Sequence, residues 1–310
     1  MADVLVFSEK PALLAELVGG GIDLGGPVSA VVFGPRAAAD TAADYGAQSV
    51  LWIEAPQNSL VEDVLPTLEQ LVRERQPRLV LIGGTRRGRV VAGRLAAWLD
   101  TTALTDVLEL QQADGVTQVR HMVWGGGALR AERLRAATVV ATAGAGVYSA
   151  LPPGQPASQV TPVAFVPSQG GAVLRERKQR VGAVTNLAGA KRVVCAGRGV
   201  GKADDLSLVN DLARALNAEV GCTRPLAEGL NWLPRERYIG ISGAQVRPDL
   251  YLGVGVSGQV QHMIGMNRSK VVVAINKDKN APIFASADYG IVGDLYAVIP
   301  ALLEALKNKR

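Results

Sequence analysis

Residues Asp249–Leu295 read DLYLGVGVSGQVQHMIGMNRSKVVVAINKDKNAPIFASADYGIVGDL, and their pattern indicates the class of fold. It begins with an apolar run, Leu250–Val256, that meets glycines and leads into an amphipathic segment at Gly258–Met266. A β-branched run, Val271–Ile275, follows, and a second glycine turn precedes a helix that begins at Asp294. This alternation of strand, glycine turn and helix is how an open α/β sheet presents backbone N–H groups to a phosphate. The stretch therefore predicts a nucleotide site.

Length and composition bound the class of the protein. A chain of 310 residues is too long for one ordinary core and predicts two domains, and 48% hydrophobic residues with 20% charged residues are typical of a soluble globular protein. Cys195 and Cys222 lie in apolar strand patterns, which indicates buried thiols in a reducing compartment rather than a disulfide. The N-terminal MADVLVFSEK lacks a basic region, so we expect no signal peptide and a cytoplasmic location. The apolar stretch Ala136–Leu151 is mostly Ala, Gly and Thr, so no membrane insertion is expected.

The net charge of +5 is unevenly placed. Residues 191–310 hold 16 Lys and Arg against 11 Asp and Glu, whereas residues 1–190 hold 17 against 17. Aromatic residues make up 5% of the chain and do not interleave with a basic stripe, so nucleic acid is not an expected partner. A dinucleotide pyrophosphate needs only a few cations, and ordinary solubility charge is the alternative explanation.

The first half of the chain alternates in the manner of a parallel sheet with helices on both faces. Short apolar or β-branched runs predict strands at Val4–Phe7, Val28–Phe33, Val50–Ile53 and Leu79–Ile82. Amphipathic segments lie between them, for example Leu60–Arg75. Further strand-like runs follow at Thr105–Leu110, Gln118–Trp124 and Thr138–Thr142, with little helix between them. We therefore expect the sheet to acquire antiparallel strands there.

A second α/β unit follows a turn-rich region. Prolines and glycines punctuate residues 152–171. The next unit opens with the strand Arg192–Ala196, the helix Asp204–Asn217 and the strand Glu219–Cys222. We predict an α/β protein of two domains, with a mixed or parallel sheet in residues 1–187 and a doubly wound parallel sheet in residues 188–310.

A G-x-G-x-x-G pattern is present at Gly253–Gly258, and Asp278 lies 20 residues beyond it. The pattern is weak by itself, because 35 glycines in 310 residues will produce it by chance. It also comes late in its α/β unit, whereas the fingerprint for NAD belongs to the first βα turn. Close packing of strand on helix is the alternative reason for these glycines.

Several runs resemble the electron transfer flavoprotein α subunit family. They are GRG at Gly197–Gly199, GCTRP at Gly221–Pro225, RYIGISG at Arg237–Gly243, SGQVQHM at Ser257–Met263, VAINKDKNAPIF at Val273–Phe284 and ADYGIVGDL at Ala287–Leu295. Their order and spacing fit the family across roughly residues 190–310 and are most similar to its FixB-like bacterial branch. The first 187 residues resemble the family more loosely.

The resemblance implies an electron carrier rather than an enzyme in its own right. The C-terminal domain would bind FAD, and the N-terminal domain would contact a FixA-like β subunit in a heterodimer. Electrons would come from an acyl-CoA dehydrogenase-type donor or a partner flavin and pass singly to an acceptor such as a quinone oxidoreductase. Electron bifurcation would depend on a second nucleotide, FAD or AMP, in the β subunit. The alternatives are a structural or regulatory paralogue without FAD, and an NAD-dependent dehydrogenase.

The resemblance also assigns the residues that bind FAD, with no catalytic residue and no metal ligand. The FAD-binding set is Arg198, Thr223, Arg224, Ile239, Gly240, Ile241, Ser242, Ser257, Gly258, Gln259, Val260, Gln261, His262, Asn276, Asp294 and Leu295.

Four of these residues have a specific role implied by the resemblance or differ from the residue that is usual in the family. Arg224 would lie against the isoalloxazine ring, where a fixed cation favours the anionic reduced forms, and an ion pair with Glu228 is the alternative. Ser242 replaces the usual threonine, whose hydroxyl bonds flavin N5, and Ile241 replaces a common glutamine. His262 would face flavin O2, and a purely structural histidine is the alternative.

A second glycine turn, GGTRRG at Gly83–Gly88, follows a predicted strand in the first half. It looks like an anion-binding turn but lacks the Gly-Lys-Ser/Thr ending of a phosphate loop. The resemblance gives the N-terminal domain no nucleotide of its own. We therefore expect a packing or subunit-contact turn, with an anion site as the lesser alternative.

Overall fold

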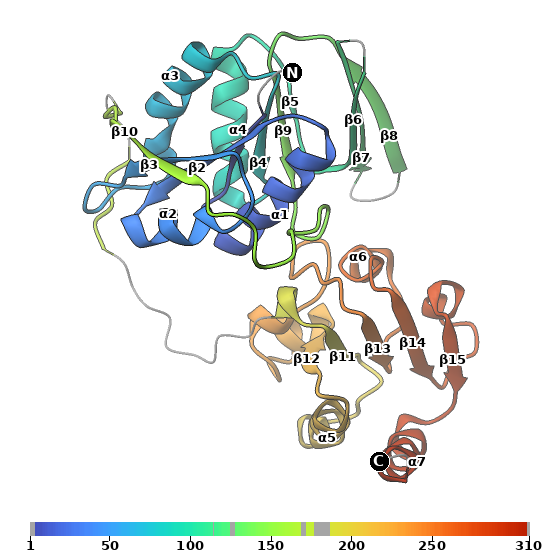
Figure 1. Cartoon of the computed structure of the whole chain (residues 1–310). Helices are drawn as coiled ribbons and strands as arrows, with labels where there is room; N and C mark the ends of the chain where they lie inside the picture. Colours follow the sequence, from blue (N-terminus) through green and yellow to red (C-terminus); the bar gives the residue numbers. More distant parts are fainter. Residues whose placement is uncertain (1–3, 114, 125–127, 169–171, 177–186, 309–310) are drawn as a thin grey trace. The chain divides into compact units, whose positions relative to one another are not determined.

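The computed structural model describes residues 4–113, 115–124, 128–168, 172–176 and 187–308 (Figure 1). The chain divides into two compact units, residues 1–179 and residues 180–310. The domain boundary expected near residue 187 stays a prediction, because residues 177–186 lie outside the described residues.

The first unit contains a seven-stranded parallel sheet in the order β10-β3-β2-β1-β4-β9-β5. Its strands are β1 Val4–Phe7, β2 Val28–Gly34, β3 Ser49–Glu54, β4 Leu79–Gly83, β5 Ala103–Leu104, β9 Val139–Ala143 and β10 Gln159–Val163. The first four match the strands predicted from apolar runs. Such runs form central parallel strands because both of their faces are buried.

Helices cover both faces of this sheet. Helices α1 (Pro11–Asp23) and α2 (Arg36–Ala43) pack in one core cluster, and α3 (Leu65–Arg75) and α4 (Arg86–Trp98) pack in the other. The segment predicted as one helix from residue 60 to residue 75 begins instead with a 3-10 turn, η1 (Val61–Val64). Pro66 lies in the first turn of α3. Because proline has no backbone N–H, it cannot donate the hydrogen bond that would extend the α-helix into the preceding residues.

The antiparallel strands form a sheet of their own. Strands β6 (Val107–Ala113), β7 (Val116–Val123) and β8 (Ala128–Leu134) pair antiparallel in a three-stranded sheet. The expectation that antiparallel strands join the main sheet is therefore wrong. The run Thr138–Thr142, expected among them, forms β9 and pairs parallel with β4.

The second unit contains a five-stranded parallel sheet in the order β12-β11-β13-β14-β15. Its strands are β11 Arg192–Ala196, β12 Glu219–Cys222, β13 Leu250–Val254, β14 Val271–Asn276 and β15 Tyr289–Val292. The second strand of the unit lies outside the first, so the order reverses between β11 and β13. In open α/β sheets, ligands bind outside the carboxyl ends of the strands at this reversal.

The two faces of the second sheet are covered differently. Helices α5 (Leu206–Leu216) and α7 (Leu295–Lys307) pack on one face, whereas turns and short helices supply most of the cover of the other. Helix α6 spans only Val260–Met263, shorter than the predicted amphipathic segment, since Gly258 has a φ of 87° that lies outside the helical region. The short helical turns of this unit are η3 Leu187–Gly189, η4 Ala203–Asp205, η5 Pro225–Gly229, η6 Arg235–Arg237 and η7 Pro282–Ser286.

Both cysteines are buried free thiols, as predicted. Within the described ranges, no helix has the length and apolar character needed to cross a membrane.

Candidate functional site

A cavity of about 760 Å³ lies at the carboxyl edge of the second sheet. The segments that follow four neighbouring strands line it. Arg198 follows β11, Thr223 follows β12, the turn Gly255–Gly258 follows β13, and Asn276 ends β14. The cavity therefore occupies the crevice where the strand order reverses, and its volume is in the range of cofactor sites.

Most of the predicted site residues line this cavity. They are Arg198, Thr223, Arg224, Ile241, Ser242, Ser257, Gly258, Gln259, Gln261, His262 and Asn276. The structure also places in its wall residues that the sequence analysis had not assigned, namely Gly199, Pro225, Tyr238, Gly255, Val256, Asp278, Ala281 and Pro282. Most of these residues lie inside the quoted runs, so their closeness in sequence to the predicted residues could have identified them.

Five predicted residues do not line the cavity, and they lie in different surroundings. Ile239 is fully buried, and Gly240 donates its N–H to the carbonyl of Ala244. Val260 is 61% exposed at the start of α6. Asp294 caps α7 by accepting a hydrogen bond from the backbone N–H of residue 296, and Leu295 is buried in the first turn of that helix. The helix expected to begin at Asp294 therefore does begin there, with Asp294 as its cap.

Glycines form the floor of the cavity where two turns touch. A Cβ built on Gly199 would lie 2.6 Å from the Cα of Gly255, and one built on Gly255, where φ is 63°, would lie 2.7 Å from the Cα of Gly199. Gly253 packs against Ile283, and a Cβ on Gly258 would lie 2.3 Å from the backbone nitrogen of Ile283. Each glycine of the G-x-G-x-x-G pattern therefore has a packing reason of its own.

Two arginines give the cavity its positive charge. Arg198 is exposed and, among the described residues, has no ion-pair partner. The Nε of Arg224 donates to Glu228 at 2.7 Å, and the same carboxylate accepts from Arg235 at 3.0 Å. This hydrogen bond and charge raise the pKa of Arg224, so its cation is permanent. The ion pair considered as the alternative for Arg224 exists, and it coexists with a place in the cavity wall.

Thr223 carries a polar atom that the protein leaves unsatisfied. Its Oγ1 is buried and has no hydrogen-bond partner within the described part of the chain. A buried hydroxyl without a partner costs free energy, and such groups in native proteins need an explanation. Thr223 lines the cavity, so this buried hydroxyl lies in the wall of the site.

His262 is buried beneath the cavity, and both of its ring nitrogens are engaged. Nδ1 lies 2.9 Å from the carbonyl oxygen of Ile239, which can only accept, so Nδ1 carries the hydrogen. Nε2 lies 2.7 Å from the hydroxyl of Tyr251 and accepts from it. Burial lowers the pKa of His262 to about 4, which keeps the ring neutral. Donation from His262 to a ligand would require the ring to give up one of these bonds.

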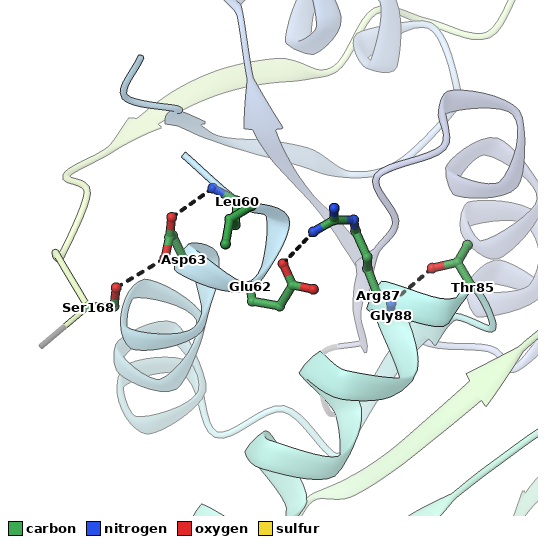
Figure 2. Close-up of polar contacts among 7 residues, drawn as sticks. All are labelled: Leu60, Glu62, Asp63, Thr85, Arg87, Gly88 and Ser168. Carbon is green, nitrogen blue, oxygen red and sulfur yellow. Dashed lines mark hydrogen bonds and ion pairs between the residues drawn. The ribbon is translucent and has the colours of Figure 1, made fainter. Parts of the chain in front are cut away.

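In the turn after β4 in the first unit, the side chains of Thr85 and Arg87 bond to protein groups (Figure 2). Thr85 caps α4 by accepting from the N–H of Gly88 at 2.9 Å, and Arg87 donates to Glu62 at 2.8 Å. In the neighbouring 3-10 turn, Asp63 accepts from the N–H of Leu60. A Cβ on Gly88 would lie 1.9 Å from the carbonyl oxygen of Gly83. The structure thus accounts for this turn by packing and helix capping.

The fold and the cavity define a class, an α/β protein of two units with a cationic, cofactor-sized cavity at the carboxyl edge of one sheet. Two family profiles match this chain. The electron transfer flavoprotein domain matches residues 11–168, and the electron transfer flavoprotein FAD-binding domain matches residues 186–267.

Relatives of known family match nearly the whole chain. YdiR of Escherichia coli (strain K12), which carries the name of an electron transfer flavoprotein subunit, is 41% identical over 310 residues and covers 98% of each chain. Protein FixB of Escherichia coli O17:K52:H18 and Protein FixB of Salmonella typhimurium are each 38% identical over 308 residues, also with 98% of each chain covered. The chain belongs to the electron transfer flavoprotein α family.

One solved structure with a match is a thiamin diphosphate-dependent enzyme from Mycobacterium smegmatis. The sequence identity is 14% and the TM-score 0.26, with 98% of this chain and 59% of that chain covered. The low TM-score means that this likeness carries no argument about fold or function.

Proposed function

We propose that this chain is the FAD-binding subunit of a heterodimeric electron carrier, with FAD held in the cavity of the second unit. The observation that carries the proposal is the cavity itself, which gathers most of the family's expected FAD residues at the reversal of strand order. The surroundings fit that cofactor. They offer the unpartnered hydroxyl of Thr223, two arginine cations, and a glycine floor that lets backbone approach a ligand closely.

The chain's own residues would place the cofactor and tune it. FAD, when bound, supplies the redox chemistry. Arg198 follows β11 and would hold the negative pyrophosphate at the strand ends. Arg224 would place a permanent cation where negative charge gathers on reduction, and Glu228 limits how far that guanidinium can move. The neutral ring of His262 would hold the turn at residues 259–262 to β13 and to the segment at Ile239.

The partners follow from the same proposal. Proteins of this family normally pair with a β subunit, and here a FixA-like chain would cover part of the flavin. An acyl-CoA dehydrogenase-type donor or a flavin of the partner would supply electrons, and an acceptor such as a quinone oxidoreductase would take them singly. The buried free thiols fit a reducing location such as the cytoplasm.

The experiment is to purify the full chain together with its β-type subunit, record the visible spectrum, and quantify released FAD and AMP per heterodimer. We expect a flavin spectrum and at least one FAD. A colourless complex would favour the alternative of a paralogue without FAD. Bound NAD and hydride transfer by this chain alone would favour the dehydrogenase alternative. The second nucleotide, FAD or AMP, would decide whether a bifurcating complex is possible.

A further inference from the structure

Tyr238 lines the cavity and was given no role by the motif that contains it. The residue is only 3% exposed, and its hydroxyl lies 3.2 Å from the Oγ of Ser242. Within the described residues, this serine is the phenol's hydrogen-bond partner. A buried phenol normally finds such a partner, so the contact explains how Tyr238 can be buried at the cavity wall.

The backbone fixes this contact. The carbonyl of Tyr238 accepts from the N–H of Ala244 at 2.7 Å, which closes the intervening turn over the tyrosine ring. Two glycines permit the closure. A Cβ built on Gly240 would lie 2.8 Å from the Tyr238 hydroxyl, and one built on Gly243 would lie 2.7 Å from the ring carbon Cδ1. The two hydroxyls therefore meet because the chain folds back on itself, and not through a free choice of rotamer.

The chemistry of the two hydroxyls gives the bond a direction. A phenol is a stronger acid than an aliphatic alcohol, so Tyr238 is the better donor and Ser242 the better acceptor. A serine that accepts from Tyr238 keeps its own hydrogen for another partner. Ser242 is exposed and lines the cavity, whereas its partner Tyr238 is buried, so a ligand in the cavity can reach the serine hydroxyl.

We propose that Tyr238 is a positioning residue that turns the hydroxyl of Ser242 into a directed hydrogen-bond donor toward the cofactor. The inference rests on the proposed function, because it needs a flavin acceptor in the cavity. A serine side chain otherwise samples three staggered rotamers, and the bond from Tyr238 selects one of them. The donor would then favour the reduced flavin, whose acceptor atoms carry more negative charge.

The first test needs no cofactor and uses a double-mutant cycle in unfolding. Tyr238→Phe, Ser242→Ala and the double variant are compared with wild type by urea denaturation of the full chain. We expect each single change to lower the folding equilibrium constant about fivefold, and the double variant to be no worse than one of them. Strict additivity would show that the two hydroxyls do not interact and would overturn the inference.

The second test measures whether Tyr238 directs the hydroxyl of Ser242 toward the flavin, and it uses the full heterodimer with flavin bound. The readout is the ratio of affinities for reduced and oxidised FAD. Ser242→Ala should lower this ratio roughly fivefold, Tyr238→Phe should lower it by a similar factor, and the double variant should match Ser242→Ala. Ser242→Thr in the Tyr238→Phe background should restore most of the ratio, because the β-branch restricts χ1 without help from the phenol.

A matched control tests whether the loss of any tyrosine hydroxyl in this unit changes the affinity ratio. Tyr289 lies in edge strand β15 of the same unit and is 66% exposed, so Tyr289→Phe should leave the ratio unchanged. If Tyr238→Phe changes nothing while Ser242→Ala does, Tyr238 does not direct the serine. A wild-type complex without flavin would contradict the proposed function, and its spectrum shows this before any variant is made.

Discussion

Two glycine turns stand at carboxyl edges of parallel sheets, one after β4 in the first unit and one after β13 in the second. In the first, Thr85 caps the helix, Arg87 pairs with Glu62, and Gly88 packs against the carbonyl oxygen of Gly83. In the second, the turn opens into a cavity whose wall holds the unpartnered hydroxyl of Thr223 and the unpaired cation of Arg198 among the described residues. Of these two glycine turns, the one after β13 lines a cofactor-sized cavity, so a glycine pattern alone does not distinguish a binding turn from a packed one.

The largest expected effect comes from adding a methyl group to each turn. Gly258→Ala places a Cβ 2.3 Å from the nitrogen of Ile283 at a φ of 87°, and Gly88→Ala places one 1.9 Å from the carbonyl of Gly83. Each change should cost about 3 kcal/mol of unfolding free energy, because backbone must move. Only Gly258→Ala should also lose FAD. The midpoint of urea unfolding measures the effect on stability, and the FAD content of the heterodimer measures the effect on binding. Equal loss of FAD in the two variants would contradict the assignment of FAD to the turn that contains Gly258.

Protonation of His262, which is buried beneath the cavity of the second unit, should make the free energy of unfolding depend on pH. Burial lowers the pKa of His262 from 6.5 to about 4, so below pH 6.5 the unfolded chain binds a proton that the folded chain does not. This contribution to stability is complete above pH 6.5 and is lost as the pH falls toward 4, by up to about 3 kcal/mol. His262→Gln should show a shallower loss of unfolding free energy than wild type over that window. Parallel curves for the two proteins would contradict a neutral, buried imidazole.

Arg224, which follows β12 in the cavity wall, and Arg87, in the turn after β4, should differ in their effect on the cofactor. Arg224→Ala should lower the ratio of affinities for reduced and oxidised FAD roughly three- to tenfold, because a charged donor beside the ring is lost. Arg87→Ala is the matched control, an arginine that also pairs with a glutamate, and it should leave the ratio unchanged because Arg87 belongs to the first unit and does not line the cavity. Redox titration of the flavin in each variant gives the ratio. An unchanged ratio in Arg224→Ala would remove that arginine from the flavin site.

The smallest effect is expected at the two helix caps. Thr85→Ala and Asp294→Ala each remove a side-chain acceptor at a helix N-terminus and should cost about 1 kcal/mol of stability. Asp294 is also a predicted FAD contact, so Asp294→Ala should weaken FAD binding a few-fold while Thr85→Ala does not. Isothermal titration with FAD, on variants stripped of cofactor, would separate the two. Equal affinities would leave Asp294 with the capping role alone.

Burial decides which parts of the fold could be predicted from the sequence. Strands β1 and β11 are recognisable because their central residues are buried on both faces and form continuous apolar runs. Strands β8, β10 and β15 were not predicted. Strand β8 is charged and largely exposed. Strand β10 is an edge strand that contains Pro162, and strand β15 is an edge strand with all four residues exposed.

The residues expected at the site lie together where a motif directly follows a strand, since parallel strands bring those ends to one edge of the sheet. Residues such as Arg198 and Ser257 therefore meet in one cavity although they are distant in sequence. Two partners to which the motifs gave no role were missed. Tyr251 bonds His262 from within β13, and the tyrosine at 238 reaches Ser242 only because the chain turns back over its ring. Neither contact follows from spacing alone.

A crystal structure of the purified heterodimer with its cofactor would show whether the cavity of the second unit holds FAD. We expect an isoalloxazine ring in the cavity, with Arg224 and Ser242 within hydrogen-bond distance of it and the pyrophosphate beside Arg198. A structure in which all flavin is bound by the partner subunit, while this cavity holds no nucleotide, would contradict the proposed function.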